Sequence, residues 1–169
     1  MTEGWFRNQT RNQALHDGTG DPLQLTDALG PKMQLDAIAT LDLAGAFELG
    51  GAQLILHSDP LPTSTPGPAV LRRTGSTAPC YAEFVIRRLV YAKNALAGGA
   101  LQGFFTLRVF GAGDIVTHRF ASTADTPLML FPWKAPGDAE SGRNELRNAL
   151  RTDVLAFAAY WRKAPPKQR

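Results

Sequence analysis

Few residues of this 169-residue chain are of a type and spacing that could support nucleophilic catalysis. The single cysteine, Cys80, could act with His118 as a nucleophile and its base. A reactive thiolate needs an adjacent base and an electropositive setting, and no pattern in the sequence brings these two residues together. The G-x-S-x-G pattern of a serine nucleophile does not occur either. We therefore expect a structural cysteine and an outward-facing histidine.

Candidate metal ligands are equally sparse. His57 lies near Asp59, and His16 precedes the sequence DGTGD at residues 17–21. Zinc sites need three or four ligands at close spacing, and calcium loops need a further carboxylate ligand later in the loop. The DGTGD segment ends instead at Pro22, so we predict a turn there and no metal site.

The glycine clusters and the acidic residues give no stronger signal for chemistry. Residues 98–99 and 111–113 match neither the P-loop pattern nor the dinucleotide-binding pattern, and we interpret their glycines as turn residues. Glu48, Glu83 and Asp114 lie in or beside predicted strands, but nothing in the sequence pairs them as an acid and a base. We therefore predict no enzymatic activity, no cofactor and no metal ion.

The basic excess of the chain lies at its C-terminal end. The net charge is +3, and residues 143–169 contain seven basic and two acidic residues. Clustered cations bind phosphate groups, although arginine stems also cover the edges of a core. Glu145 and Asp153 lie in the same segment and are expected to pair with the arginines. The alternative function is therefore nucleic-acid binding, through the residues Arg143, Arg147, Arg151, Arg162 and Lys163.

Two irregular segments suggest contacts with another protein. Residues 1–32 are rich in Asn, Gln, Thr, Asp and Gly, which predicts an extended polar arm. Aromatic residues near the tip of such an arm often act as anchors in a groove. Residues 59–79 form a long loop whose prolines exclude a helix or a central strand. The expected partner-binding residues are Trp5, Phe6, Pro60, Pro62 and Pro66.

Alternation of apolar and polar residues predicts most of the strands. Residues 35–43 alternate with a period of two, interrupted only by Ile38, and residues 53–57 give a second, shorter strand. Residues 80–97 fit either a strand to about residue 93 or a helix, and their β-branched and aromatic content favours the strand. Residues 101–120 predict a β-hairpin around a glycine turn. Residues 128–131 suggest a short edge strand.

The C-terminal segment predicts one long amphipathic helix over residues 139–163. Asp138 or Ser141 could cap its start, and Pro165 ends it. Its apolar residues recur every three or four positions, which predicts a stripe that packs on a sheet. The stripe consists of Leu146, Leu150, Val154, Phe157 and Trp161.

These elements predict an α+β protein, with a mostly antiparallel sheet and the C-terminal helix packed on one face. We divide the chain into an extended arm at residues 1–32, one domain at residues 33–164 and a basic tail at residues 165–169. No apolar run is long enough for a membrane-spanning helix. The N-terminal residues also lack the apolar core of a signal peptide.

The favoured function is a non-enzymatic structural or adaptor subunit of a larger assembly, in a bacterium or a phage. Its partners are expected to be other protein subunits, including further copies of this chain. A third interpretation is a bacterial envelope accessory protein, since strands followed by a terminal amphipathic helix occur in such proteins. We expect a cytoplasmic or virion-associated location, or a periplasmic one if an export signal has been removed.

Overall fold

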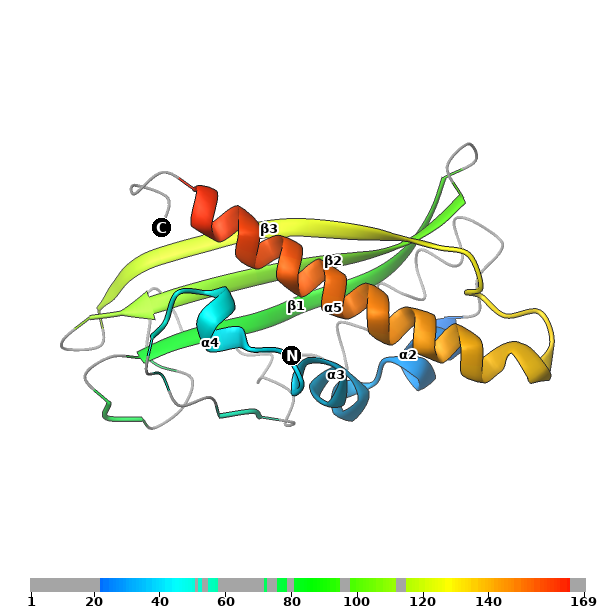
Figure 1. Cartoon of the computed structure of the whole chain (residues 1–169), viewed down its shortest axis with the longest axis horizontal. Helices are drawn as coiled ribbons and strands as arrows, with labels where there is room; N and C mark the ends of the chain where they lie inside the picture. Colours follow the sequence, from blue (N-terminus) through cyan, green and yellow to red (C-terminus); the bar gives the residue numbers. More distant parts are fainter. Residues whose placement is uncertain are drawn as a thin grey trace.

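The computed structural model of the chain (Figure 1) describes residues 22–50, 52, 55–57, 72, 76–78, 81–94, 98–111 and 115–164. Several sequence predictions fall outside these ranges and stay predictions. They concern the residues Trp5, Phe6, Pro60, Pro62, Pro66 and Cys80, and the basic tail at residues 165–169.

Three long antiparallel strands form the sheet. They are β1 (Tyr81–Asn94), β2 (Gly98–Phe110) and β3 (Val116–Leu128), in the spatial order β1-β2-β3. This confirms the strand interpretation of residues 80–97 over the described residues 81–94. It also confirms the two antiparallel strands of the predicted hairpin, whose turn residues 112–114 lie outside the described ranges. The separate edge strand expected at residues 128–131 is wrong, because β3 itself runs to Leu128 and the chain then bends away from the sheet.

The long helix α5 (Ala139–Lys163) packs on one face of the sheet, as the sequence predicted (Figure 1). All five residues of the predicted stripe are buried. The expected side-chain cap is wrong: Asp138 occupies the capping position without a capping hydrogen bond, and Ser141 already lies inside the helix. A side-chain cap requires an extended backbone at the capping residue. The backbone of Asp138 is helical instead, because a short 3₁₀ turn, η2 (Pro136–Asp138), leads directly into α5.

The strand predicted for residues 35–43 is wrong, because this region forms two short helices. Helix α3 (Pro31–Ile38) begins with a proline, whose fixed φ suits the first turn of a helix. Its buried residues are Gln34, Ala37 and Ile38, which are spaced like one face of a helix. Ile38 is the residue that interrupted the predicted alternation. Helix α4 (Leu43–Ala46) follows. The described part of the second predicted strand, residues 55–57, is not a strand either.

The expected N-terminal arm does not extend as far as residue 32. Residues Pro22–Ala28 form helix α2, and Leu25, Ala28 and Leu29 are fully buried in the core. Their spacing of three and four residues is that of an apolar helix face. This part of the segment is therefore a helix that contributes to the core.

One aromatic cluster joins the sheet, α5 and the N-terminal helices. The ring of Phe157 on α5 lies 5.3–6.0 Å, between ring centroids, from four other phenylalanine rings. Trp161 adds a directional link, because its indole N–H donates to the backbone oxygen of Phe47 at 3.1 Å. The four phenylalanines around Phe157 are Phe47, Phe84, Phe105 and Phe120.

Candidate functional site

The turn between β3 and α5 is fixed by a single carboxylate. Glu145 on α5 accepts hydrogen bonds from the backbone N–H groups of Met129 at 2.6 Å, Leu130 at 2.9 Å and Phe131 at 2.9 Å. Hydrogen bonds to an ionised acceptor are among the stronger ones in proteins. They engage the N–H groups that a further strand would need, which explains why residues 129–131 leave the sheet. The expected pairing of Glu145 with an arginine is therefore wrong.

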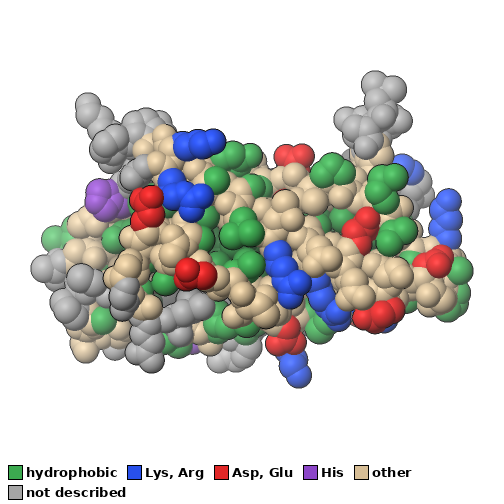
Figure 2. All heavy atoms as spheres, in the orientation of Figure 1, with side chains coloured by type: hydrophobic (Ala, Val, Ile, Leu, Met, Phe, Trp, Pro, Cys, Tyr) green, Lys and Arg blue, Asp and Glu red, His purple; other side chains and the backbone are tan. Residues whose placement is uncertain are grey.

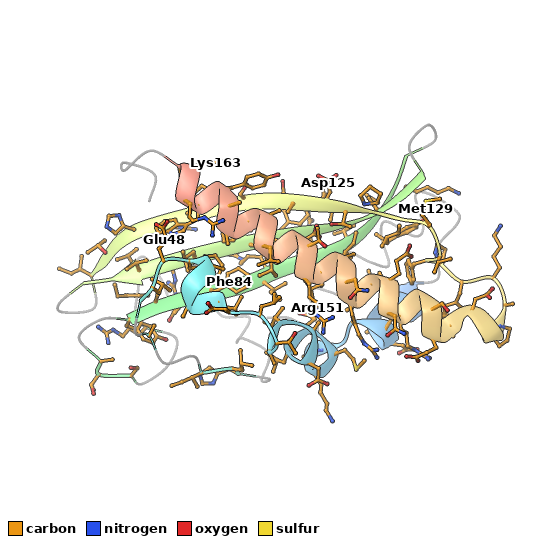
Figure 3. All side chains as sticks on the ribbon, viewed as in Figure 1. Glu48, Phe84, Asp125, Met129, Arg151 and Lys163 are labelled. Atoms are coloured by element: carbon orange, nitrogen blue, oxygen red, sulfur yellow. The ribbon has the colours of Figure 1, made fainter. Side chains whose placement is uncertain are left out.

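The same turn directs two apolar side chains into solvent. Met129 is 88% exposed and Leu130 is 49% exposed, whereas the next residue, Phe131, is buried. The Phe131 ring packs edge-on against Tyr91 and Trp133. Met129 lies where the chain leaves β3 (Figure 3). We call Met129 and Leu130 the apolar turn, and it is held in place from both sides, by Glu145 and by the buried Phe131.

The Glu145→Gln variant should loosen this turn. A glutamine side chain keeps one acceptor oxygen but places an NH₂ group where the second carboxylate oxygen accepted N–H groups. We expect a loss of about 2 kcal/mol in the free energy of unfolding, measured by chemical denaturation, together with faster amide exchange at residues 129–131. A Glu140→Gln variant is the matched control, since Glu140 is exposed and forms surface ion pairs with Arg143 and Arg147 on the same helix. Unchanged exchange at residues 129–131 would show that Glu145 does not fix the turn.

Strand β3 forms one edge of the sheet along its whole length. It is 13 residues long and pairs with β2 on one side, and the described part of the chain contributes no strand on its other side (Figure 1). A strand at a sheet edge presents backbone N–H and C=O groups that can pair with another chain. Its charged side chains Arg119 and Asp125 are exposed, and Asp125 is labelled along this strand in Figure 3. The edge of β3 and the apolar turn are continuous.

Asp153 is a buried carboxyl group between α5 and β3. It is 1% exposed, and its Oδ1 accepts a hydrogen bond from the Thr126 hydroxyl at 2.7 Å. Among the described residues its Oδ2 has no hydrogen-bond partner. Burial raises the pKa of Asp153 to about 7, with a small further contribution from the charge of Asp125, against the lowering effect of the Thr126 hydrogen bond. The expected ion pair of Asp153 with an arginine is wrong, because the side chain points into the core.

Two of the arginines proposed to bind nucleic acid, Arg143 and Arg147, contact residues of their own helix. Arg143 lies 3.6 Å and Arg147 lies 3.7 Å from the carboxylate of Glu140, and Arg147 also donates to the side chain of Asn144 at 2.8 Å. Figure 2 shows basic side chains interspersed with acidic ones over the α5 face, rather than gathered in one patch. A mixed surface of this kind gives a weaker attraction for phosphate than clustered cations do.

The other two proposed arginines, Arg151 and Arg162, bind the N-terminal helices. Arg151 donates from Nε to the backbone oxygen of Ala37 at 2.7 Å, and Arg162 donates to the backbone oxygen of Ala46 at 2.7 Å. Figure 3 shows Arg151 beside α3. Lys163 is exposed at the end of α5. Internal contacts thus account for four of the five residues proposed to bind nucleic acid.

The candidate catalytic residues are not brought together in the described part of the chain. Glu83 is buried and forms an ion pair with Arg108 across β1 and β2, and it accepts a hydrogen bond from the Tyr81 hydroxyl at 3.0 Å. His118 is exposed on β3, as expected, and His57 is also exposed. The described residues include no group of three His, Cys, Asp or Glu side chains that could hold a metal ion.

Sequence reasoning missed the roles of Glu145, Asp153 and the apolar turn. Asp153 did carry a signal, since it lies three residues after Leu150 and four before Phe157, on the buried side of the helix. An acidic residue at such a position indicates a buried carboxyl group. Glu145 carried none, because its partners lie 14–16 residues away and depend on the path of the turn.

The fold and this site define a small α+β domain with a three-stranded antiparallel sheet, one long helix on its face and one edge strand that continues into an apolar turn. No protein-family model and no curated protein matches the chain. A solved structure of a "putative lipoprotein" from Caulobacter crescentus CB15 is 15% identical, with a TM-score of 0.27, over 87% of this chain and 88% of that one. A likeness at this level supports no conclusion about function. No described helix is long and apolar enough to cross a membrane.

Proposed function

We propose that this protein is a non-enzymatic subunit of a protein assembly, and that it acts by binding another chain through the β3 edge and the apolar turn. The observation that carries the proposal is the exposure of Met129 and Leu130 on a backbone that Glu145 holds in place. Single exposed apolar residues are ordinary on protein surfaces. Here two adjacent ones lie on a fixed turn, so the backbone that presents them loses little conformational entropy on binding.

The sequence also predicts partner contacts elsewhere in the chain. Trp5 and Phe6 as aromatic anchors, and Pro60, Pro62 and Pro66 as a second loop contact, stay predictions, since these residues lie outside the described ranges. The proposal does not depend on these residues, because the apolar turn is complete without them. An assembly role is also compatible with the distribution of the arginines, four of which make contacts within the chain.

The two other functions considered from the sequence have less support. Binding of nucleic acid by Arg143, Arg147, Arg151, Arg162 and Lys163 would require most of these side chains to exchange internal contacts for phosphate contacts. A role in the bacterial envelope stays a prediction from the order of the elements.

The proposal is tested by placing a photo-crosslinking residue at position 129 of the full-length protein in its own cells. We expect one covalent adduct of defined mass, since Met129 is 88% exposed on the proposed contact. The same residue at position 134 is the matched control, because Lys134 is exposed further along the same loop. A Leu130→Ser change in the position-129 protein should remove most of the adduct without changing the unfolding midpoint. Equal labelling at positions 129 and 134 would overturn the proposal.

A further inference from the structure

The amino-acid sequence of β3 is complementary to itself in the antiparallel direction. When two copies of the strand are placed side by side with Ser122 opposite Ser122, Arg119 of each copy faces Asp125 of the other. Arg119 and Asp125 are six residues apart, so they lie on the same face of the sheet. The two-fold symmetry of such a pair produces the contact between Arg119 and Asp125 twice.

We propose that the chain bound at the β3 edge is a second copy of this protein, paired antiparallel about a two-fold axis at Ser122 so that one continuous sheet runs through both copies. This inference rests on the proposed function, since it names the partner that the β3 edge receives. It also fixes the register, because a shift of one or two residues would move Arg119 away from Asp125.

Neither Arg119 nor Asp125 has an opposite charge directly across from it in β2. Across the β2–β3 pairing, Arg119 faces Arg108, and Asp125 faces the neutral Gln102. Oppositely charged residues directly across two strands stabilise the pairing, whereas like charges weaken it. Pairing with a second copy gives each of the two exposed charges an opposite charge across the new strand pair.

Two exposed apolar residues flank β3. Ile115 precedes the strand and is 65% exposed, and Met129 follows it and is 88% exposed. The paired residues do not extend to them, because the register of β3 shifts at Thr117 and the chain leaves the sheet after Leu128. They lie beside the two ends of the proposed strand pair.

Proteins usually block the pairing of an exposed edge strand, whereas the β3 edge is open to pairing over most of its length. Unpaired edges are commonly short or interrupted by bulges or prolines. Residues 118–126 of β3 pair with β2 without interruption. The bulge at Thr117 lies near one end of the strand, and Pro127 stands next to its last residue. At that position a missing backbone N–H affects only the end of a pairing ladder. An unrelated extended segment could also occupy the edge, but it would not depend on both Arg119 and Asp125.

The test is a charge exchange, with the molar mass of the full-length protein measured by sedimentation over a range of concentrations. The native protein should form a dimer. Arg119→Asp and Asp125→Arg should each weaken the dimer on the order of thirtyfold, because two ion pairs become two like-charge pairs. An equimolar mixture of the two variants should form a mixed dimer, since every facing pair then joins an acid and a base. The protein carrying both substitutions should form a dimer again.

The control is Arg87→Asp, which changes an exposed arginine on β1 at the other edge of the sheet and should leave the molar mass unchanged. A native protein that is monomeric at every concentration overturns self-pairing, as does a dimer that none of the β3 variants affects. Failure of the mixture and of the double variant to recover the dimer also overturns it. In each case an adduct at position 129 to a different polypeptide would leave the proposed function standing, whereas the absence of any adduct would remove both.

Discussion

The Asp153→Asn variant is expected to remove most of the dependence of stability on pH in this protein. The pKa of Asp153 is about 7 in the folded state, above its ordinary value of 3.8. Between these two values the folded state binds more protons than the unfolded state, so the free energy of unfolding falls as pH rises. The difference corresponds to at most about 4 kcal/mol lost between about pH 4 and pH 8.

Chemical denaturation at a fixed protein concentration, at about pH 5 and about pH 8, measures this effect. The native protein should be less stable at the higher pH, because the carboxylate is then charged in a buried site. Asparagine cannot ionise and can still accept the hydrogen bond of Thr126, so the variant should have nearly the same stability at both pH values. Asp36→Asn, which changes an exposed carboxylate on α3, should keep the native pH profile. A native pH profile in the Asp153→Asn variant would show that this group does not titrate as described.

The Phe157→Ala variant should cause the largest loss of stability. Phe157 is fully buried, and its ring contacts four other phenylalanine rings. One of them follows α4, and the other three lie on β1, β2 and β3. Truncating it removes apolar burial and leaves a cavity, which costs about 3–5 kcal/mol of unfolding free energy.

Denaturant titration of the variant measures that loss at constant m-value. Leu155→Ala is the matched control on the same helix, because Leu155 is exposed and its truncation should change stability by no more than about 0.5 kcal/mol. If Phe157→Ala costs less than about 1 kcal/mol, the aromatic cluster is not the centre of the core.

Elements with one dominant period could be predicted from the sequence. The stripe from Leu146 to Trp161 repeats every three or four residues over four helical turns, and the hairpin strands are marked by β-branched and aromatic residues around a glycine turn. In both cases local preference and tertiary packing favour the same structure, so the sequence pattern was sufficient to predict the element.

Helix α3 could not be predicted from alternation, because its sequence satisfies two periods at once. Leu35 and Ala37 fit a strand with a period of two, while Gln34, Ala37 and Ile38 fit one face of a helix. The starting proline and the good helix formers that follow it favour the helix. Packing against α5, supported by the hydrogen bond from Arg151 to Ala37, then stabilises the helical form.

The candidate site was less predictable than the fold, because it depends on contacts between distant parts of the chain. Glu145 was expected to pair with arginines of its own helix, but the turn places three backbone N–H groups closer to it. The complementarity of β3 is present in the sequence, yet it has meaning only once the structure shows that this strand is an edge.

Hydrogen–deuterium exchange of the full-length protein tests most directly the claim that β3 receives another chain. The native protein and the Arg119→Asp variant are compared at one concentration, chosen so that the native protein is assembled. Amides of residues 116–128 should exchange more slowly in the native protein, because a second strand takes the outward-facing N–H groups, whereas amides of β2 should exchange equally in both. The variant that also carries Asp125→Arg should regain slow exchange. Equal exchange of residues 116–128 in all three proteins would contradict the account.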